Sequence, residues 1–499
     1  MSELTIREER IKKANELREL GINPYPNNFE VDVELNTICQ KYNDKLEAGD
    51  HTEDIYQVAG RIVLHRDMGG LQFATIQDES GQLQISFMKK KTPEIFKLLK
   101  YIDLGDIIGV KGEVFKTKKG ELSILAQEFT LLCKSLTDLG DKFHGVKDIE
   151  IKYRNRSLDM VTNPESRDII KNRFLITQKI REFMIKEGYL EVETPITQVS
   201  YGGAAADPFV THHNDLDMDL FLRVSPEQSL KRVIAGGMNA VFEINKNFRN
   251  EGIDRTHNPE FTMMEAYRAF KDYTYCMDML ERMVEFVMLE VFGTLECEFR
   301  GQKVNFQRPW RKLSVKDALK EAKGWDVDSM SDEELFSEVK KIGEDLPKQT
   351  RGYAILALFE EFGEPLGVQP THFIDYPVES TPLCKQHRDN PELIERFESF
   401  VCGMEISNAY TELNDGQRQR ELFTTQAEFK EEGQEETWGD GLDEEFLDAI
   451  DLGMPPTGGI GVGIDRLAMV LLNQESIRDI IYFPTMKPKK KDSEAKAEE

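Results

Sequence analysis

The stretch at residues 241–267 carries side chains that could bind a ligand with phosphate, base and ammonium groups. Polar and apolar residues alternate near both of its ends, and a glycine and an Asn-Pro pair interrupt the pattern between them, which predicts an antiparallel hairpin. A guanidinium, an aromatic ring, a carboxylate and a phenol then share its polar face: Arg249, Phe261, Glu265 and Tyr267. Most alternating hairpins present only a solvated face, so the pattern alone does not establish a binding site.

Three glutamates that stand seven residues apart, Glu398, Glu405 and Glu412, suggest a magnesium site. Proteins bind Mg²⁺ through one or two carboxylates together with the phosphates of a substrate. In a helix this spacing would give one solvated face, but Gly403 and the sequence around Asn408 disfavour a helix. In a strand, the odd spacing separates Glu405 and Glu412 onto opposite faces, which a β-bulge near Asn408 would resolve.

Two glycine-rich segments, at residues 202–214 and 455–472, allow a backbone to approach a ligand closely. The second segment fails the G-x-G-x-x-G dinucleotide pattern, because Ile464 occupies the third glycine position. The chain has no G-x-x-x-x-G-K-[ST] sequence either, so Rossmann and P-loop sites are disfavoured. In this segment Arg466 falls in the first turn of an expected helix.

The elements that would position these residues follow from hydrophobic periodicity. Helices are predicted at residues 5–20, ended by Gly21, at 169–187, followed by a strand closed by Pro195, and at 273–292. Between residues 56 and 132, about five short strands with a helical piece at 93–101 match the layout of an OB-fold barrel. The mixed, aperiodic stretch at 141–159 is interpreted as a linker.

The predicted barrel could bind single-stranded nucleic acid, because bases stack on aromatic side chains of its open face. The candidates expected to be exposed are Phe73 and, near turns, Arg61, Gln84 and Glu121. A lone phenylalanine in a strand is more often a core residue, and this alternative stays open for Phe73.

Composition limits the class of protein. The 499 residues, 39% of them apolar, are enough for two or three domains. The six cysteines contain no C-x-x-C pair, which argues against disulfides and zinc and indicates free thiols. Because the sequence shows neither an apolar leader nor about 18 consecutive apolar residues, we expect no membrane contact and a cytoplasmic location.

The net charge of -27 disfavours broad nucleic-acid binding, which requires lysine and arginine. Residues 1–145, however, contain 20 Lys+Arg against 24 Asp+Glu and are nearly neutral. A basic face could therefore lie on this part, and any RNA contact should be local and selective.

The wording FRNEG…HNPEFTMME resembles motif 2 of the class II aminoacyl-tRNA synthetases, in the form typical of bacterial lysyl-tRNA synthetases. Residues 175–195 are similar to motif 1, which forms a dimer interface in this family, residues 457–472 to motif 3, and LQFATIQD…GQLQIS…KTKKGELSI to the anticodon-binding domain. The resemblance implies an α+β protein. An N-terminal OB-fold β-barrel would precede a class II synthetase domain with a mixed, mainly antiparallel sheet flanked by helices.

The resemblance also implies a domain plan and an activity. The plan is a helical extension (1–50), an OB-fold domain (51–145), a linker (146–165), a catalytic domain (166–486, with motif 2 at 241–267) and a charged tail expected to be disordered (487–499). The activity is the ligation of lysine to tRNA(Lys) by a homodimer, with ATP as substrate and one to three Mg²⁺ ions as cofactor.

The residues implied by the resemblance fall into four groups. Those for lysine are Gly203, Glu227, Arg249, Glu265, Tyr267, Asn408, Tyr410 and Glu412. Those for ATP are Arg249, Glu251, His257, Phe261, Glu405 and Arg466, of which Arg249 and Arg466 are catalytic. Those for magnesium are Glu398, Glu405 and Glu412, for which we accept the bulge as a hypothesis, and those for the anticodon are Arg61, Phe73, Gln84 and Glu121.

Two departures and several alternatives accompany the resemblance. Asp207 stands where most relatives carry arginine, and Gln228-Ser229 replaces a more usual Leu-Tyr. An enzyme that lysylates a translation factor would share the catalytic motifs without needing the barrel, and a non-catalytic RNA-binding paralogue would lose motif residues. Aspartyl and asparaginyl synthetases share the domain order, and only the acidic pocket, suited to two ammonium groups, separates them.

Overall fold

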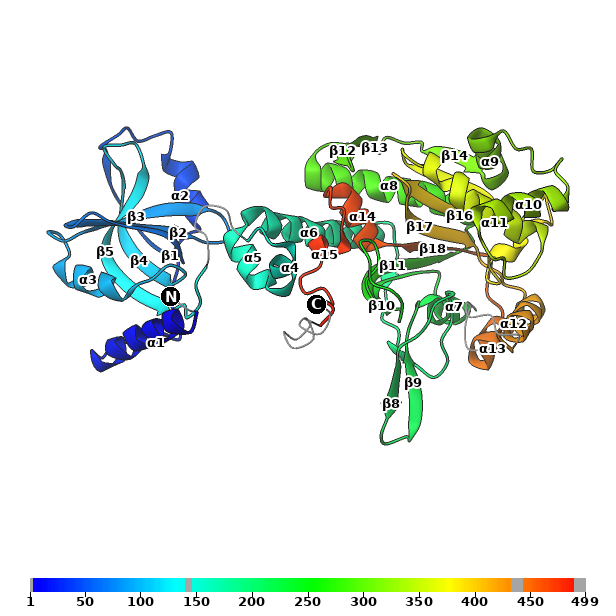
Figure 1. Ribbon diagram of the computed structural model, residues 1–499, viewed down its shortest axis with the longest axis horizontal. Helices are drawn as coiled ribbons and strands as arrows, with labels where there is room; N and C mark the ends of the chain where they lie inside the picture. The colour runs from blue at the N-terminus through cyan, green and yellow to red at the C-terminus, as the bar shows by residue number, and fades with distance from the viewer. Residues whose placement is uncertain (1–2, 140–145, 432–442, 489–499) are drawn as a thin grey trace, which may run out of the picture. The chain divides into compact units, whose positions relative to one another are not determined.

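The computed structural model describes residues 3–139, 146–431 and 443–488, and the chain divides into two compact units, Met1–Pro164 and Glu165–Glu499 (Figure 1). The α+β fold class is confirmed. Most of the predicted tail at 487–499 and the beginning of the predicted linker lie outside the described residues.

The first unit contains a closed five-stranded barrel with the strand order β1-β2-β3-β5-β4, so the predicted OB-fold is confirmed. Its strands are β1 (His51–Asp67), β2 (Leu71–Gln77), β3 (Gln82–Met88), β4 (Ile107–Lys116) and β5 (Leu122–Cys133). As expected, a helical piece, α3 (Pro93–Leu98) with η1 (Leu99–Tyr101), joins β3 to β4. Alternate residues of each strand fill the interior, among them Ala74 and Ile85, which are fully buried.

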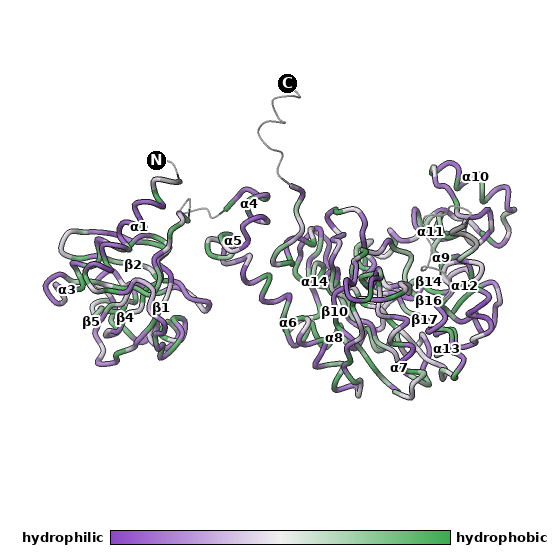
Figure 2. Tube along the Cα trace, turned by 90° about the horizontal axis from the view of Figure 1, so that it is seen from below, coloured by the Kyte–Doolittle hydropathy of each residue, from purple (hydrophilic) through white to green (hydrophobic). Residues whose placement is uncertain are grey.

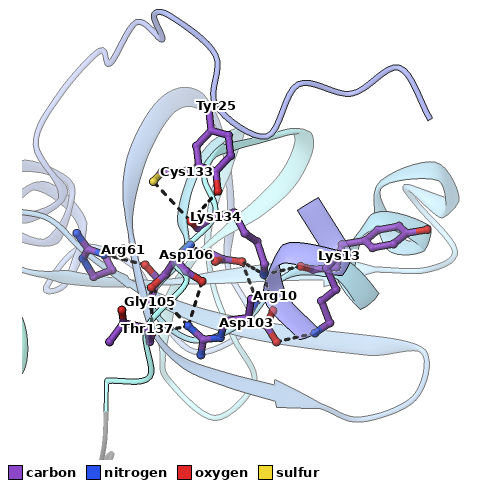
Figure 3. A network of polar contacts seen from close by, with 12 residues as sticks. Arg10, Lys13, Tyr25, Arg61, Asp103, Gly105, Asp106, Cys133, Lys134 and Thr137 are labelled. Carbon is purple, nitrogen blue, oxygen red and sulfur yellow. Dashed lines mark hydrogen bonds and ion pairs between the residues drawn. The ribbon is translucent and has the colours of Figure 1, made fainter. Parts of the chain in front are cut away.

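Helix α1 (Glu3–Glu19), predicted from the sequence, is largely hydrophilic (Figure 2), and it contacts the barrel both through the buried Leu17 and through charged groups. Lys134 is fully buried, and its ammonium donates to Asp106 at 2.7 Å and is paired with Asp103 (Figure 3). From α1, Lys13 donates to Asp103 at 2.6 Å and Arg10 donates to the Ser135 carbonyl at 3.1 Å. A paired network therefore adds to the apolar contact that Leu17 makes with the barrel core.

The part of the predicted linker that the structure describes contains two short helices. It forms α4 (Ile149–Arg154) and α5 (Arg156–Thr162), of six and seven residues. Asp148 caps α4 by accepting from two backbone N–H groups, and Asn155 caps α5. Each helix has fewer than two turns, so neither shows a hydrophobic period in the sequence.

The second unit is built on an eight-stranded sheet with the order β14-β15-β16-β17-β18-β11-β10-β6. The strands are β6 (Leu190–Glu191), β10 (Ala240–Phe248), β11 (Glu260–Ala269), β14 (Arg311–Ser314), β15 (Thr371–Pro377), β16 (Leu393–Val401), β17 (Met404–Thr411) and β18 (Thr457–Val462). Only the β14–β15 and β10–β6 pairs are parallel, which confirms a mixed, mainly antiparallel sheet.

Helices cover both faces of this sheet (Figure 1). One face packs on α6 (Pro164–Lys186), α8 (Tyr273–Phe292) and α14 (Ile464–Leu471). The other face packs on α7 (Glu227–Ala235), α9 (Val315–Lys323), α10 (Asp332–Ile342), α11 (Arg351–Phe362) and α13 (Glu444–Asp451). In β11, Met264 belongs to the first core and Tyr267 to the second, as alternation along a strand requires.

Shorter elements complete the described chain. They are α2 (Leu35–Tyr42), β7 (Thr197–Gln198), β8 (Val210–His213), β9 (Met218–Leu222), β12 (Glu296–Phe299), β13 (Gln302–Asn305), η2 (Glu364–Leu366), η3 (Val378–Ser380), α12 (Gly416–Glu431) and α15 (Ile477–Ile480). All six cysteines are free, as predicted. None of the helices described has the length and apolar composition needed to cross a membrane.

Candidate active site

A cavity of about 380 Å³ lies in the second unit, along the sheet face that carries Tyr267. Every residue that the sequence analysis assigned to lysine, ATP or magnesium lines it: Gly203, Glu227, Arg249, Glu251, His257, Phe261, Glu265, Tyr267, Glu398, Glu405, Asn408, Tyr410, Glu412 and Arg466. The cavity therefore collects side chains from β11 and the loop before it, from β16 and β17, and from the first turns of α7 and α14.

The predicted hairpin is confirmed and forms the cavity floor. In the β10–β11 ladder, Asn247 pairs with Phe261 and Glu243 with Glu265, so alternate residues of both strands point to one side. Arg249 follows β10, and its guanidinium carbon lies 5.2 Å from the centre of the Phe261 ring. Burial lowers the pKa of Arg249, although neighbouring carboxylates oppose the shift.

One end of the cavity is strongly acidic. Glu265 accepts hydrogen bonds from Ser225 Oγ at 2.7 Å and from Tyr267 Oη at 2.9 Å, and Glu227 accepts from Tyr410 Oη at 2.7 Å. Burial, followed by the charge of Glu227, raises the pKa of Glu265 to about 8. This end can therefore exchange a proton for a cationic ligand near neutral pH.

Lys231 belongs to this acidic end, and the sequence reasoning missed it. Its ammonium is fully buried, lies 2.5 Å from Glu227 Oε1, and is ion-paired with Glu412. The available signal was its position four residues after Glu227 on an amphipathic helix, which places the two side chains together. The sequence does not reveal its second partner, because Glu412 follows β17 and lies far from Lys231 along the chain.

The glycines of β18 leave room for the acidic end. A Cβ atom at Gly459 would stand 1.9 Å from Glu412 Oε1 and 2.6 Å from Tyr267 Cε1, so only glycine fits there. In the structure, the backbone of this glycine segment lies close to the side chains of Glu412 and Tyr267.

The opposite end of the cavity carries basic groups suited to phosphates. Arg466 lies in the first turn of α14, as predicted, with Nη1 2.9 Å from Glu405 Oε2 and Nη2 3.1 Å from His257 Nε2. His257 Nδ1 lies 2.8 Å from Asp254 Oδ2, so this contact fixes the orientation of the imidazole ring. Glu251, on the loop between the two hairpin strands, lines the same region.

The β-bulge hypothesis is confirmed, and the structure places the bulge at Ile406. Ser399 pairs with Ser407 but Phe400 pairs with Glu405, so Ile406 is the extra residue. Ile406 and Ala409, three residues apart, both lie in the core, although regular alternation would separate them. The bulge thereby lets Glu405 face the cavity together with residues further along β17.

The three glutamates do not form one metal cluster. In the described ranges, no three His, Cys, Asp or Glu side chains are arranged to hold an ion. Glu412 is paired with Lys231, whereas Glu398 accepts from Arg396 at 2.5 Å. Burial raises the pKa of Glu398, and the nearby charge of Glu405 adds to this effect against that of Arg396. All three carboxylates line the cavity, with Glu405 beside Arg466 and Glu412 beside Lys231.

The candidates on the barrel lie in different surroundings. Phe73 is half-buried on β2, and Glu121 is exposed just before β5. Gln84 was expected to be exposed, but it is buried, and its amide donates at 2.8 Å to Ser123 Oγ, its register partner on the neighbouring strand β5. Arg61 donates to the Gly105 carbonyl at 2.8 Å.

The two departures noted in the sequence have defined surroundings. Asp207 is exposed, and its carbonyl accepts from the Asn250 amide at 2.8 Å. Gln228 is buried, and a Cβ at Gly202 would stand 2.5 Å from its Nε2, so the glycine makes room for this glutamine.

Comparison with known proteins gives matches over almost the whole chain. Residues 148–487 match the model of the family "tRNA synthetases class II (D, K and N)", and residues 56–132 match the "OB-fold nucleic acid binding domain" family. The first match covers the described sheet-based unit together with α4 and α5, and the second covers most of the barrel.

Curated relatives extend over nearly the full length. The chain is 44% identical over 483 residues to a lysine–tRNA ligase of Carboxydothermus hydrogenoformans, covering 96% of this chain and 97% of that protein. It is 44% identical to the lysine–tRNA ligase of Pelotomaculum thermopropionicum, covering 96% and 94%. It is 43% identical to that of Syntrophomonas wolfei, covering 98% and 99%.

Proposed function

Because the chain belongs to the class II tRNA synthetases and, within them, to the lysine–tRNA ligases, we propose that its cavity activates lysine with ATP and that its barrel binds tRNA(Lys). The observation that carries this proposal is the polarity of the cavity. Three buried carboxylates meet at one end, and Arg249, Arg466 and His257 lie toward the other. Lysine has two ammonium groups for the acidic end, and ATP has phosphates for the basic end.

The acidic end selects lysine. Glu227 receives the α-ammonium group, and Glu412, with Glu265 and Tyr267 beside it, receives the side-chain ammonium group. Gly203, Asn408 and Tyr410 complete the walls around lysine. An aspartate or asparagine side chain would leave these carboxylates without a cation, at a cost of several kcal/mol.

ATP lies across the hairpin. Phe261 stacks under adenine with Glu251 near its edge, and His257 and Arg466 contact the terminal phosphates. Arg249 lies between the lysine carboxylate and the α-phosphate and balances the charge of both. Glu398 and Glu405 would hold Mg²⁺, which supplies further charge neutralisation at the phosphates when bound.

The chemistry needs no nucleophilic side chain. An oxygen of the lysine carboxylate attacks the α-phosphorus, the bond to the bridging oxygen breaks, and pyrophosphate leaves. A hydroxyl of the terminal adenosine of tRNA then attacks the lysyl carbonyl, and AMP leaves. The protein accelerates both steps by holding the reactants in line and by matching their charge.

The remaining assignments concern the partners. Phe73, Gln84, Glu121 and Arg61 are the residues of the barrel that we assign to the anticodon, with stacking on Phe73 as the main contribution. Two chains associate through the motif 1 segment, where the structure exposes the apolar side chains of Ile185 and Leu190. The enzyme acts in the cytoplasm, where charged tRNA is consumed.

The decisive experiment measures the exchange of labelled pyrophosphate into ATP with each of the twenty amino acids. We expect exchange with lysine and none with aspartate or asparagine. Activity with either of these, and none with lysine, would overturn the proposal. Lysylation of a tRNA(Lys) transcript in the same preparation separates a tRNA ligase from an enzyme that modifies a protein.

A further inference from the structure

Lys231 lies between two of the carboxylates that receive the ammonium groups of lysine in the proposed function. Its ammonium is 2.5 Å from Glu227 Oε1, on its own helix, and is paired with Glu412, the residue that follows β17. It also lies 5.6 Å from the centre of the Tyr410 ring. The contacts of Lys231 therefore join the α-ammonium site and the side-chain ammonium site.

The charges of the acidic end balance only when Lys231 is included. Glu227, Glu265 and Glu412 carry three negative charges when ionised, and Lys231 carries one positive charge. The resulting net charge of minus two balances the plus two of the two ammonium groups of lysine. The substrate carboxylate lies at Arg249. Without Lys231, one buried carboxylate would remain without a cation, and such a charge is strongly unfavourable.

We propose that Lys231 is a specificity-determining residue that sets the acidic end to accept two ammonium groups and holds Glu227 and Glu412 in the positions that receive them. The inference rests on the proposed function, because it takes the two carboxylates as the ammonium sites. Lys231 acts through these carboxylates and is a positioning residue, not a catalytic one.

The groups around Lys231 support a role in charge matching. Glu227 comes from α7, Glu265 and Tyr267 from β11, and Tyr410 from β17. Glu412 directly follows β17 and forms an isolated bridge with Cys384, which lies before β16. The charge of Lys231 lowers the pKa of Glu412 and Glu265 against the upward effect of burial. Removing that charge therefore moves these carboxyl groups toward the protonated form.

The central variant is Lys231→Met, which keeps the length of the side chain and removes its charge. We expect the KM for lysine in pyrophosphate exchange to rise at least about tenfold, while the KM for ATP changes less than about twofold, because the basic end is untouched. The matched control is Arg232→Met. Arg232 is the next residue, is exposed and pairs with Glu445 at 3.1 Å, so the same loss of charge should leave both constants unchanged.

The pH profile distinguishes charge matching from a structural role. In Lys231→Met an extra proton occupies the acidic end at neutral pH, and lysine must displace it. The dissociation constant for lysine, measured by calorimetry, should therefore rise more steeply in the variant than in the wild type as the pH falls from about 8.5 to about 6.5.

A double variant tests whether the loss in Lys231→Met comes from misfolding or from the changed charge. The double variant Lys231→Met/Glu412→Gln restores a charge of minus two with one carboxylate fewer. Its loss of lysine affinity should be at least about fivefold smaller than the product of the two single losses, and its pH profile should return to the wild-type slope.

The outcomes separate the inference from the proposed function. A wild-type enzyme without lysine-dependent exchange would overturn the function itself. An active wild type, together with a Lys231→Met variant that keeps the wild-type lysine KM and pH profile, would overturn only the inference. Equal losses toward lysine and ATP in both Lys231 variants would likewise overturn it, because they would indicate a structural role.

Discussion

Glu265 illustrates how burial gives a single carboxyl group a functional proton. It accepts hydrogen bonds from Ser225 and Tyr267, yet its pKa is raised to about 8 by burial and by the Glu227 charge. At pH 7 a group with this pKa is mostly protonated. An arriving ammonium group favours the ionised form, so the bound state has the lower pKa.

This difference predicts the pH dependence of lysine binding in the wild-type enzyme. Binding releases the proton of Glu265, so the affinity should increase as the pH rises from about 6.5 to about 8 and level off above the pKa of the free site. Calorimetry at pH 7 in two buffers of different ionisation enthalpy should reveal the release of close to one proton per site. An affinity that is flat over this range would contradict the assignment.

At the scale of the element, strand β18 depends on glycine at Gly459. An alanine there would press its Cβ against Glu412 Oε1 and the Tyr267 ring, and the neighbouring strands fix both residues. Gly459→Ala should therefore reduce lysine-dependent exchange about a hundredfold or more. Gly70→Ala is the control, because its Cβ would meet nothing within 4 Å. Nearly unchanged exchange in Gly459→Ala would show that the acidic end is not as tightly packed as described.

The buried pairs of Lys134 hold Asp103 and Asp106 together in the N-terminal unit, and Lys13 of helix α1 pairs with the same Asp103. Replacing Lys134 by methionine leaves Asp103 and Asp106 near each other without their shared cation, which should destabilise the N-terminal unit by about 3–5 kcal/mol. Urea unfolding of the full chain should show a transition at a lower urea concentration than in the wild type. Below that concentration, pyrophosphate exchange should persist. Lys97→Met removes an exposed pair with Glu94 and should leave the transition in place. An unchanged transition in Lys134→Met would mean that the network contributes little.

At the scale of the whole molecule, we expect a change in the barrel to affect tRNA charging but not lysine-dependent exchange, which depends on the sheet-based unit. Phe73→Ala should lower the kcat/KM of tRNA charging by the equivalent of about 1–3 kcal/mol through lost base stacking, with lysine-dependent exchange intact. Exchange serves as the internal control, because it needs no tRNA. Equal losses in both assays, with a lower unfolding temperature, would identify Phe73 as a core residue.

The exposed apolar side chains of the motif 1 segment predict a dimer. Sedimentation at micromolar concentration should give about twice the chain mass. Ile185→Asp should shift the protein toward the monomer, because Ile185 is 55% exposed and a charge there would be buried on association. Leu452→Asp, at an 83% exposed position on the segment after α13, should leave the mass unchanged. A wild-type monomer with full activity would contradict the proposed interface.

The sequence by itself determined the features that depend on neighbours in the chain. Periodicity predicted the hairpin with Arg249 and Glu265, the helix at 273–292 and the barrel, because side-chain direction repeats every 2 or 3.6 residues within an element. Motif wording predicted the cavity residues, and all of those assigned to lysine, ATP or magnesium line one cavity.

Only the tertiary structure decided which side chains became partners. The sequence required a bulge near Asn408, but the register of β16 and β17 placed it at Ile406. Gln84 is buried on β3, which pairs with a strand on either side. Glu412 forms an ion pair with Lys231 and does not cluster with the other glutamates. These outcomes depend on contacts between segments far apart in the chain, and a local pattern specifies the direction of a side chain but not what it will meet.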